Sequence, residues 1–173
     1  KTSEILELTG NTASVTALDI SKSRVKRLEE NLRRLSLSVT CLAADARKTG
    51  KWWDGKLFDR VLLDAPCSGT GVIRRHPDIR FIRTPDDIEK LAQTQKGLMD
   101  TAWSVLKPGG VLLYSTCSVM KRENELQAES FLKRHPDAIA SELWSGGPSS
   151  HQVLPGEDDG DGFFFARLIK KPE

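Results

Sequence analysis

Apolar and polar residues follow two patterns along this chain, one typical of strands and the other of helices. Short apolar runs, typical of buried strands, cover residues 14–20, 39–44, 58–63, 111–115, 139–143 and 163–170. Apolar residues at helical spacing lie between those runs, at residues 5–9, 21–35, 86–106 and 121–134. Because strands alternate with helices, the pattern predicts an α/β fold with a mainly parallel, doubly wound sheet.

Local signals place the ends of several elements. Ser21 is suited to cap the helix that follows it, and Asp86 or Asp87 is suited to cap the long helix at residues 86–106. The sequence Lys107-Pro108-Gly109-Gly110 is a helix stop signal. Two polar stretches are expected to be loops, residues 67–85 and 145–162.

The composition suits a single soluble domain. Of the 173 residues, 38% are hydrophobic and 29% are charged, and no apolar run is long enough to cross a membrane. The start of the chain carries no signal-peptide pattern. We therefore expect a cytoplasmic monomer with no membrane partner and no metal. Because the net charge is only +2, any contact with nucleic acid must come from local basic patches.

Two of the predicted strands end in a cysteine with polar neighbours. Cys67 follows the run Leu62-Leu63-Asp64-Ala65-Pro66, and Cys117 follows Leu113-Tyr114-Ser115-Thr116. Open α/β sheets bind ligands at the carboxyl ends of their strands, so the pattern predicts one site with two thiols. The third cysteine, Cys41, is expected in the core, and the odd number without a secretory signal favours free thiols. The alternatives are a disulfide between Cys67 and Cys117, or two inert core thiols.

Three acids also end successive strands, namely Asp19, Asp45 and Asp64. An acid after the second strand of a doubly wound sheet commonly binds ribose hydroxyls, and the next one can accept from an adenine amino group. A single strand-end acid more often caps the following helix, but three in series favour an adenosine-containing cofactor. A nicotinamide dinucleotide would need a Gly-rich turn before the first helix, and this sequence begins after that point.

Several motifs resemble the RNA 5-cytosine methyltransferases of the Sun group, in the branch that acts on bacterial 16S ribosomal RNA. The two most specific motifs contain the thiols, Asp64-Ala65-Pro66-Cys67-Ser68-Gly69-Thr70-Gly71 and Ser115-Thr116-Cys117-Ser118. Further matching stretches are residues 71–79, 91–93 and 154–164. The resemblance extends from Lys1 to Lys170 and implies a Rossmann-like methyltransferase that uses S-adenosyl-L-methionine.

The resemblance also implies a role for each motif residue. Cys117 matches the nucleophile that adds to carbon 6 of the cytosine, and Cys67 matches the thiol that assists release by elimination. Asp64 would bond the cytosine edge or the cofactor, Asp19 the ribose, and Asp45 the adenine. Lys1 matches the last residue of the family's Gly-rich cofactor loop, Pro-Gly-Gly-Lys.

Two parts of the family's pattern are missing from the sequence. They are the first strand with the glycines before Lys1, and the amino-terminal RNA-binding domain. Residues 1–173 are therefore expected to be a methyltransferase catalytic domain that lacks its first strand and cofactor loop. In this fold, that strand would lie between the strands that end at Asp19 and Asp64.

The loop at residues 67–85 is basic and lies beside Cys67, so we expect it to hold phosphates of 16S ribosomal RNA. Its candidate RNA-binding residues are Arg74, Arg75, His76 and Arg80. A solvated loop without a ligand is the alternative. At the level of function, the alternatives are a methyltransferase acting on tRNA, a DNA 5-cytosine methyltransferase in which Cys67 attacks, and an inactive RNA-binding module.

Overall fold

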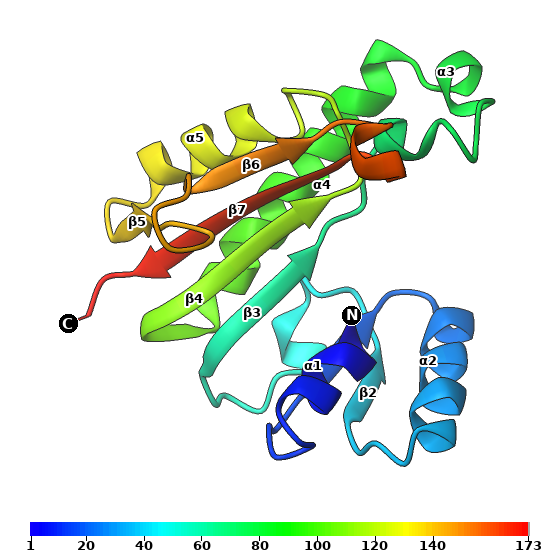
Figure 1. The fold of residues 1–173 in the computed structure, drawn as a ribbon. Coiled ribbons are helices and arrows are strands. Elements are labelled where there is room, and N and C mark those ends of the chain that lie inside the picture. Colours follow the sequence, from blue (N-terminus) through cyan, green and yellow to red (C-terminus); the bar gives the residue numbers. More distant parts are fainter. Residues whose placement is uncertain (173) are drawn as a thin grey trace. The chain divides into compact units, whose positions relative to one another are not determined.

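The fold was obtained as a computed structural model that describes residues 1–172 (Figure 1). It consists of two compact units, Lys1–Asp54 and the part of the chain from Gly55 onward. Each unit has its own sheet, and we describe each by itself.

The first unit pairs two short parallel strands. Its elements are α1 (Thr2–Leu8), β1 (Thr16–Asp19), α2 (Lys22–Arg34), β2 (Thr40–Ala43) and a 3-10 turn at Thr49–Lys51. Strand β1 runs parallel to β2 with Asp19 opposite Ala43, so both strands end at the same edge. Ser21 caps α2 as predicted, because its hydroxyl accepts the N–H of Arg24 at 3.4 Å. The described part of this unit fully buries few apolar side chains, Leu6, Val25 and Leu32.

The second unit contains a five-stranded mixed sheet. Its strands are β3 (Phe58–Asp64), β4 (Leu106–Thr116), β5 (Ala138–Ala140), β6 (Ser150–Val153) and β7 (Phe163–Lys170). Strands β3 and β4 are parallel, whereas β7 runs antiparallel to β4, β5 and β6. The predicted α/β, Rossmann-like class is confirmed, and the antiparallel pairs all involve the last strand.

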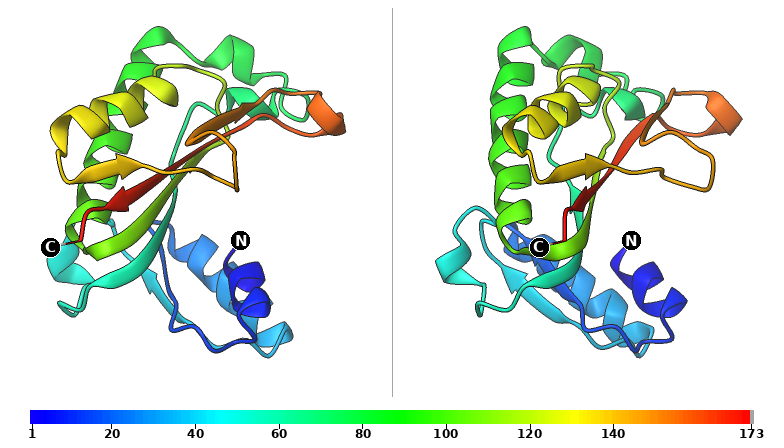
Figure 2. Two further views of the ribbon diagram at one scale, coloured as in Figure 1. Left: turned by 60° about the vertical axis from the view of Figure 1, so that its left-hand side comes forward. Right: turned by 90° about the vertical axis from the view of Figure 1, so that its left-hand side faces the viewer.

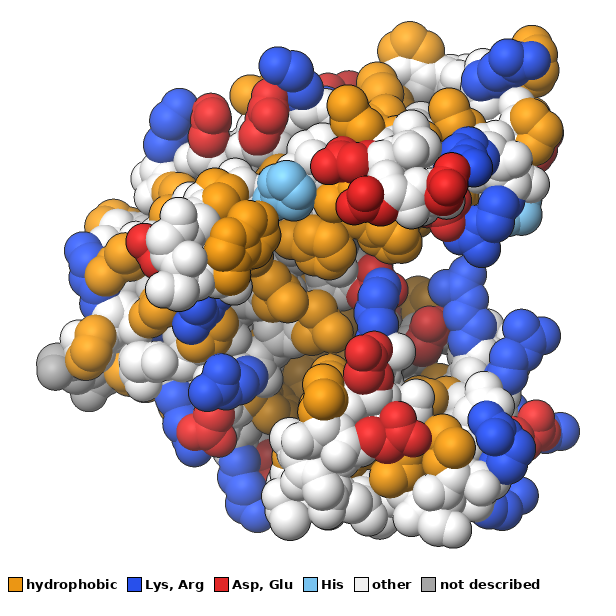
Figure 3. Space-filling model, viewed as in Figure 1, with side chains coloured by type: hydrophobic (Ala, Val, Ile, Leu, Met, Phe, Trp, Pro, Cys, Tyr) orange, Lys and Arg blue, Asp and Glu red, His pale blue; other side chains and the backbone are white. Residues whose placement is uncertain are grey.

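Two helices cover one face of this sheet, α4 (Pro85–Ser104) and α5 (Glu125–Arg134) (Figure 2). The core between the helices and the sheet is formed by apolar side chains from both, including Met99, Trp103, Leu106, Leu112, Tyr114, Phe131, Phe164 and Leu168. The long loop after β3 contains a 3-10 turn at Thr70–Val72 and the short helix α3 (Ile79–Ile82). Hydrophobic side chains reach the surface on the face shown in Figure 3. The exposed large apolar residues of the strands in this unit include Leu62 and Ile139.

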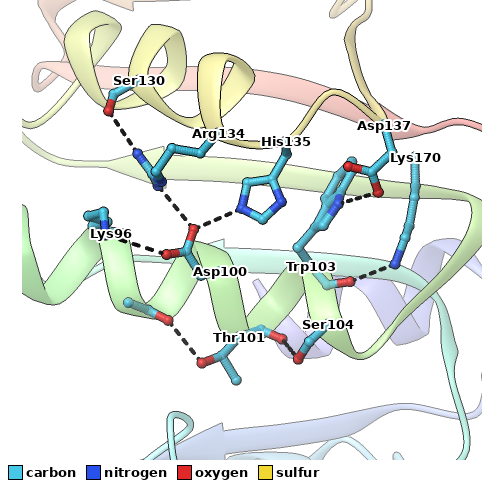
Figure 4. Close-up of polar contacts among 11 residues, drawn as sticks. Lys96, Asp100, Thr101, Trp103, Ser104, Ser130, Arg134, His135, Asp137 and Lys170 are labelled. Carbon is cyan, nitrogen blue, oxygen red and sulfur yellow. Dashed lines mark hydrogen bonds and ion pairs between the residues drawn. The ribbon is translucent and has the colours of Figure 1, made fainter.

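Polar contacts join α4 to α5 and β7 at one end of the core (Figure 4). Asp100 on α4 accepts hydrogen bonds from Arg134 and His135, both at 3.0 Å. Burial raises the pKa of the Asp100 carboxyl, but the bonds from His135 and Arg134 outweigh it and hold the pKa below its usual value. Nearby, the indole N–H of Trp103 donates to Asp137 at 2.9 Å, and the Lys170 ammonium donates to the Trp103 carbonyl. These ion pairs and hydrogen bonds add to the apolar packing that holds α4 against α5 and β7.

Two predicted helix starts need correction. Helix α4 is capped by Thr84 and not by Asp86 or Asp87, because Thr84 and Asp87 form a reciprocal capping box and Pro85 suits the first helical position. Helix α5 begins at Glu125 and not at residue 121. The four residues before it form a turn, and the polar side chains of Glu123 and Asn124 point into the protein, where both are buried.

Two strand boundaries and one whole strand also differ from the prediction. Strand β4 begins at Leu106 rather than at residue 111, because Lys107–Gly110 continues the strand, and its register with β3 shifts between Phe58 and Arg60. Strand β5 ends at Ala140 rather than at residue 143. Strand β6 lies inside the predicted loop at residues 145–162. Its sequence, Ser-His-Gln-Val, is too polar to signal a strand, and it forms only by pairing with β7.

Among the described strands, β1 pairs with β2 alone, and β3 pairs with β4 alone. The expectation of an additional strand between β1 and β3 stays a prediction.

Candidate active site

The two cysteine motifs meet at the end of the β3–β4 pair. Asp64 lies opposite Ser115 in the parallel register, so Cys67 and Cys117 follow at nearly the same height. Their sulfur atoms lie 3.3 Å apart, within hydrogen-bonding distance, and both cysteines are free thiols. The structure therefore brings the two predicted thiols together, and the disulfide alternative does not hold in it.

The surroundings of Cys67 keep its thiol protonated. The hydrogen bond shared with Cys117 raises the pKa of Cys67 most, and burial raises it further. The backbone N–H groups of Gly69 and Cys117 act in the opposite direction but are outweighed. A thiol that retains its proton can donate a hydrogen bond to a thiolate, so Cys67 is suited to stabilise a negative charge on Cys117.

Glu123, which the sequence analysis did not single out, joins the two cysteine loops. Its side chain is fully buried, and one oxygen accepts the N–H of Ser68 at 2.8 Å. The other oxygen accepts the hydroxyls of Ser68 and Ser118, both at 2.6 Å. Gln95 on α4 donates to the same carboxylate at 3.0 Å and to the carbonyl of Pro66 at 2.9 Å. The residues that follow each cysteine are thus held by one carboxylate.

Asn124 holds the strand end that carries Cys117. Its side-chain oxygen accepts the hydroxyl of Thr116 at 2.6 Å, and its amide donates to the carbonyl of Ser118 at 2.8 Å. The Asn124 amide also donates to Gln152 on β6 at 2.6 Å. Because Asn124 forms hydrogen bonds with the residues on both sides of Cys117, the backbone that carries this thiol is held rigidly.

Gly71 provides the third contact between the motifs. Its N–H donates to the carbonyl of Cys117 at 2.9 Å, and its carbonyl accepts the N–H of Gly162 at 2.8 Å. A side chain here would collide with main chain, because a Cβ on Gly71 would lie 2.2 Å from the Gly162 carbonyl oxygen and 2.8 Å from that of Cys117. Only glycine permits this crossing of three backbone segments.

Asp64 lies at the end of β3, three residues before Cys67, and its side chain is exposed. The hydroxyl of Ser115 approaches one of its oxygens at 3.4 Å. The carboxylate is therefore presented at the end of β3, in the strand pair that leads to the two thiols, and its role in the site stays a prediction.

Asp19 and Asp45 lie at the carboxyl edge of the first unit's sheet. One oxygen of Asp19 accepts the N–H of Ser21 at 2.7 Å, and Arg24 lies 3.6 Å from the other. Asp45 forms a two-pronged pair with Arg47 at 3.0 and 2.9 Å, and the hydrogen bonds from Arg47 lower the pKa of Asp45. Both acids thus lie where strand-end ligands bind. Lys1 is exposed, and its carbonyl starts α1 by accepting the N–H of Ile5.

The predicted RNA-binding residues are all exposed, but two of them are also tethered. Arg74 donates to the carbonyl of Gly160 at 3.1 Å, and Arg75 forms an ion pair with Asp161. Arg80 instead stacks on the ring of Phe81, with 4.6 Å from its guanidinium carbon to the ring centre. Phe81 is 76% exposed, so this basic loop also presents an aromatic face.

No helix within residues 1–172 is long and apolar enough to cross a membrane. These residues also contain no group of three or more histidine, cysteine or acidic side chains that could hold a metal ion.

A Rossmann-like α/β fold, with strand-end acids and two thiols at neighbouring strand ends, makes this chain similar to proteins of the methyltransferase class. Residues 1–169 match the model of the family "16S rRNA methyltransferase RsmB/F", and the chain belongs to that family.

Similar proteins and structures agree with this assignment. The chain is 50% identical to a ribosomal RNA small subunit methyltransferase B of Salmonella arizonae and to one of Vibrio cholerae, each over 99% of this chain. It spans only 40% and 39% of the length of those relatives. The crystal structure of NSun6 from Pyrococcus horikoshii with SFG has a TM-score of 0.86 and 32% identity, and covers 99% of this chain and 45% of that one. A methyltransferase homologue from the same organism has a TM-score of 0.82 and 31% identity, over 98% of this chain and 57% of that one.

Proposed function

We propose that the protein containing this chain methylates carbon 5 of a cytosine in 16S ribosomal RNA through a covalent cysteine–cytosine adduct. The observation that carries the proposal is the 3.3 Å approach of the Cys67 and Cys117 sulfurs, in a chain of the RsmB/F family. We propose further that this protein works in the cytoplasm and as a monomer.

In this proposal, Cys117 is the nucleophile. Its thiolate forms a bond to carbon 6 of the cytosine, which makes carbon 5 electron-rich enough to take a methyl group. S-adenosyl-L-methionine supplies that methyl group when bound. Water then accepts the proton of carbon 5, the electron pair of that C–H bond forms the carbon 5–carbon 6 double bond, and the bond between Cys117 and carbon 6 breaks to release the methylated base. The thiolate is regenerated, so the cycle consumes no residue of the protein.

Cys67 has two uses in this cycle. Its protonated thiol, with the raised pKa described above, donates a hydrogen bond that favours the thiolate form of Cys117. After methyl transfer the same thiol donates a hydrogen bond to the departing Cys117 sulfur and so assists the elimination that frees it. Asp64, exposed beside the thiols, is suited to accept a hydrogen bond from the amino group of the cytosine and so hold the ring during the attack.

The cofactor residues proposed are Lys1, Asp19, Asp45 and Asp64. The fit rests on the two acids of the first unit, because Asp19 and Asp45 lie at one edge of a parallel strand pair and their carboxylates can accept hydroxyl and amino donors. In the second unit, the exposed residues Arg74, Arg75, His76 and Arg80 are proposed to contact RNA phosphates, with Phe81 beside them.

The function is tested with the whole protein, methyl-labelled S-adenosyl-L-methionine and a 16S ribosomal RNA transcript. RNA carrying 5-fluorocytosine should trap the adduct, because fluorine cannot leave carbon 5 as a proton does. We expect Cys117→Ala to abolish both methyl transfer and trapping, with Cys41→Ala as the control thiol.

Full activity of Cys117→Ala together with an inactive Cys67→Ala would move the attack to Cys67, as in the DNA-type alternative. A wild-type protein that binds the RNA but neither methylates nor traps it would support the inactive-module alternative instead.

A further inference from the structure

The carboxylate of Glu123 has no role in the reaction proposed above, yet it is fully buried and bound to the residue that follows each cysteine. Burying a charged or polar group is costly unless its hydrogen bonds are satisfied. Four donors reach the two oxygens of Glu123, from the Ser68 backbone, the hydroxyls of Ser68 and Ser118, and the amide of Gln95. Four donors match the acceptor capacity of an ionised carboxylate.

The donors come from three separate parts of the second unit. Ser68 directly follows Cys67, and Ser118 directly follows Cys117. Gln95 lies on α4 and also binds the carbonyl of Pro66, the residue before Cys67. Glu123 therefore touches one side of each cysteine through its neighbour, although it contacts neither sulfur in the hydrogen bonds of the described residues.

The backbone of Glu123 is fixed as well. Its carbonyl accepts the hydroxyl of Tyr114 at 2.6 Å, and its N–H donates to the carbonyl of Met120 at 2.9 Å. Tyr114 is fully buried on β4, the strand that leads to Cys117. The backbone of Glu123 is thus held in place. Its short hydrogen bonds to Ser68 and Ser118 restrict the separation of the loops that carry Cys67 and Cys117.

We propose that Glu123 is a positioning residue that sets the distance between the Cys67 and Cys117 sulfurs. The proposal rests on the proposed function for its biological meaning, but its geometric content stands without it. Removing the carboxylate should let the loops drift apart, which weakens the hydrogen bond between the thiols and slows both attack and release. Binding of RNA and cofactor should change little, because none of the four bonds involves a residue proposed to hold either.

The first test measures the thiol spacing directly with phenylarsine oxide. This reagent bonds two neighbouring thiols at once through its arsenic atom and releases one water, so its retention reports how close the sulfurs lie. On the whole protein we expect Glu123→Ala to lower retention at Cys67 and Cys117, located by peptide mapping, by about tenfold or more, the effect of losing charge-assisted hydrogen bonds.

The variants separate positioning from folding. Glu123→Gln keeps the shape and part of the hydrogen bonding, so its retention should lie between those of the wild type and Glu123→Ala. Ser68→Ala and Ser118→Ala each remove one hydroxyl and should give smaller losses of the same kind. Gln127→Ala is the matched control, because Gln127 is buried on the next turn of the chain and bonds the carbonyl of Ala92 on α4, away from both cysteine loops. It should retain the reagent like the wild type.

The second test measures the kinetics of methyl transfer. We expect Glu123→Gln to lower kcat while KM for RNA and for cofactor stays unchanged, and its 5-fluorocytosine adduct to form more slowly. Unchanged retention and kcat in a folded Glu123→Gln or Ser68→Ala variant would overturn the proposal, as would a loss in Gln127→Ala as large as in Glu123→Ala. If wild-type protein retains the arsenical in a Glu123-dependent manner but does not methylate, the proposed function fails and the positioning role stands.

Discussion

The two units use strand-end residues in very different surroundings. In the first unit, Asp19 and Asp45 follow four-residue strands, and the Asp19 side chain is 34% exposed with its nearest partners only two and five residues away. In the second unit, the residues around Cys67 and Cys117 are held by fully buried side chains, Ser68, Ser118 and Glu123, whose bonds cross up to 55 residues of sequence. The thiols lie in a network of buried, long-range hydrogen bonds, whereas Asp19 and Asp45 are held only by residues close to them in sequence.

This difference indicates which chemistry each unit is built for. A thiol that must attack one atom needs its position fixed closely, and long-range hydrogen bonds in a buried core supply that rigidity. Carboxylates that accept hydroxyl and amino donors from a flexible ligand tolerate more freedom. We therefore expect substitutions in the second unit to act mainly on the reaction, and those in the first unit to act mainly on cofactor affinity.

The largest effect is expected for Gly71→Ala. The added methyl group would collide with the carbonyl oxygens of Gly162 and Cys117, and neither is the flexible end of a side chain. The cysteine loop must then shift, so methyl transfer should fall by about 100-fold or more, in line with a displacement of about 1 Å in an active site. The measurement is kcat with labelled cofactor.

Gly50→Ala is the matched control, because nothing lies within 4 Å of a Cβ at that position. Near-normal turnover of Gly71→Ala would show that the crossing of the three backbone segments does not fix the thiols, and the contrast between the two units would then lose its basis.

A smaller and different effect is expected for Asp19→Ala. Each charge-assisted hydrogen bond to a ribose hydroxyl contributes roughly 1.5–3 kcal/mol, so the cofactor dissociation constant should rise by about ten- to a hundredfold. Calorimetry on the whole protein measures it, with Glu30→Gln on the exposed surface of α2 as the control. RNA affinity and the retention of phenylarsine oxide should not change. If the cofactor dissociation constant of Asp19→Ala equals that of the wild type, Asp19 is not part of the cofactor site.

The smallest effect is expected for Asp100→Asn, which tests the core behind the thiols. The pKa of Asp100 is lowered in the folded protein, so its charge contributes stability above the unfolded pKa of about 3.9, and this contribution is lost as the pH falls through the lower folded value. Because the side chain is 35% exposed, we expect a loss of only about 0.5–1 kcal/mol at pH 7.

Urea unfolding of wild type and Asp100→Asn, in steps from pH 7 towards pH 3, gives the difference directly. The two curves should converge at the acid end, and Asp59→Asn, which removes an exposed pair with Lys107, should leave the midpoint unchanged. If the difference in free energy of unfolding between the two proteins grows as the pH falls, the ionised Asp100 carboxylate does not stabilise the fold.

The sequence predicted those parts of the site that follow from strand order alone. Apolar runs located β3 and β4, and because parallel neighbours end at one edge, the meeting of Cys67 and Cys117 could be foreseen. Glu123 could not be foreseen in this way. It lies in the polar run Lys121-Arg122-Glu123-Asn124, which looks like an exposed helix start, and its partners are far away in sequence.

Strand β6 escaped prediction for a related reason. A polar strand at the side of a sheet carries no alternating pattern, and only its pairing with β7 defines it. The cap of α4 could have been read from Thr84-Pro85-Asp86-Asp87, which has the spacing of a capping box. Local signals were thus present for the helix, whereas tertiary contacts alone determine the strand and the buried acid.

The measurement that tests the central claim most directly is the fate of the RNA adduct in Cys67→Ala, using the whole protein, unmodified 16S ribosomal RNA and S-adenosyl-L-methionine. If Cys117 attacks and Cys67 assists release, the variant should accumulate a protein–RNA band that resists denaturant and disappears with RNase, and peptide mapping should place the base on Cys117. Absence of that band together with normal turnover would contradict the account, because the thiol 3.3 Å from Cys117 would then have no part in the reaction.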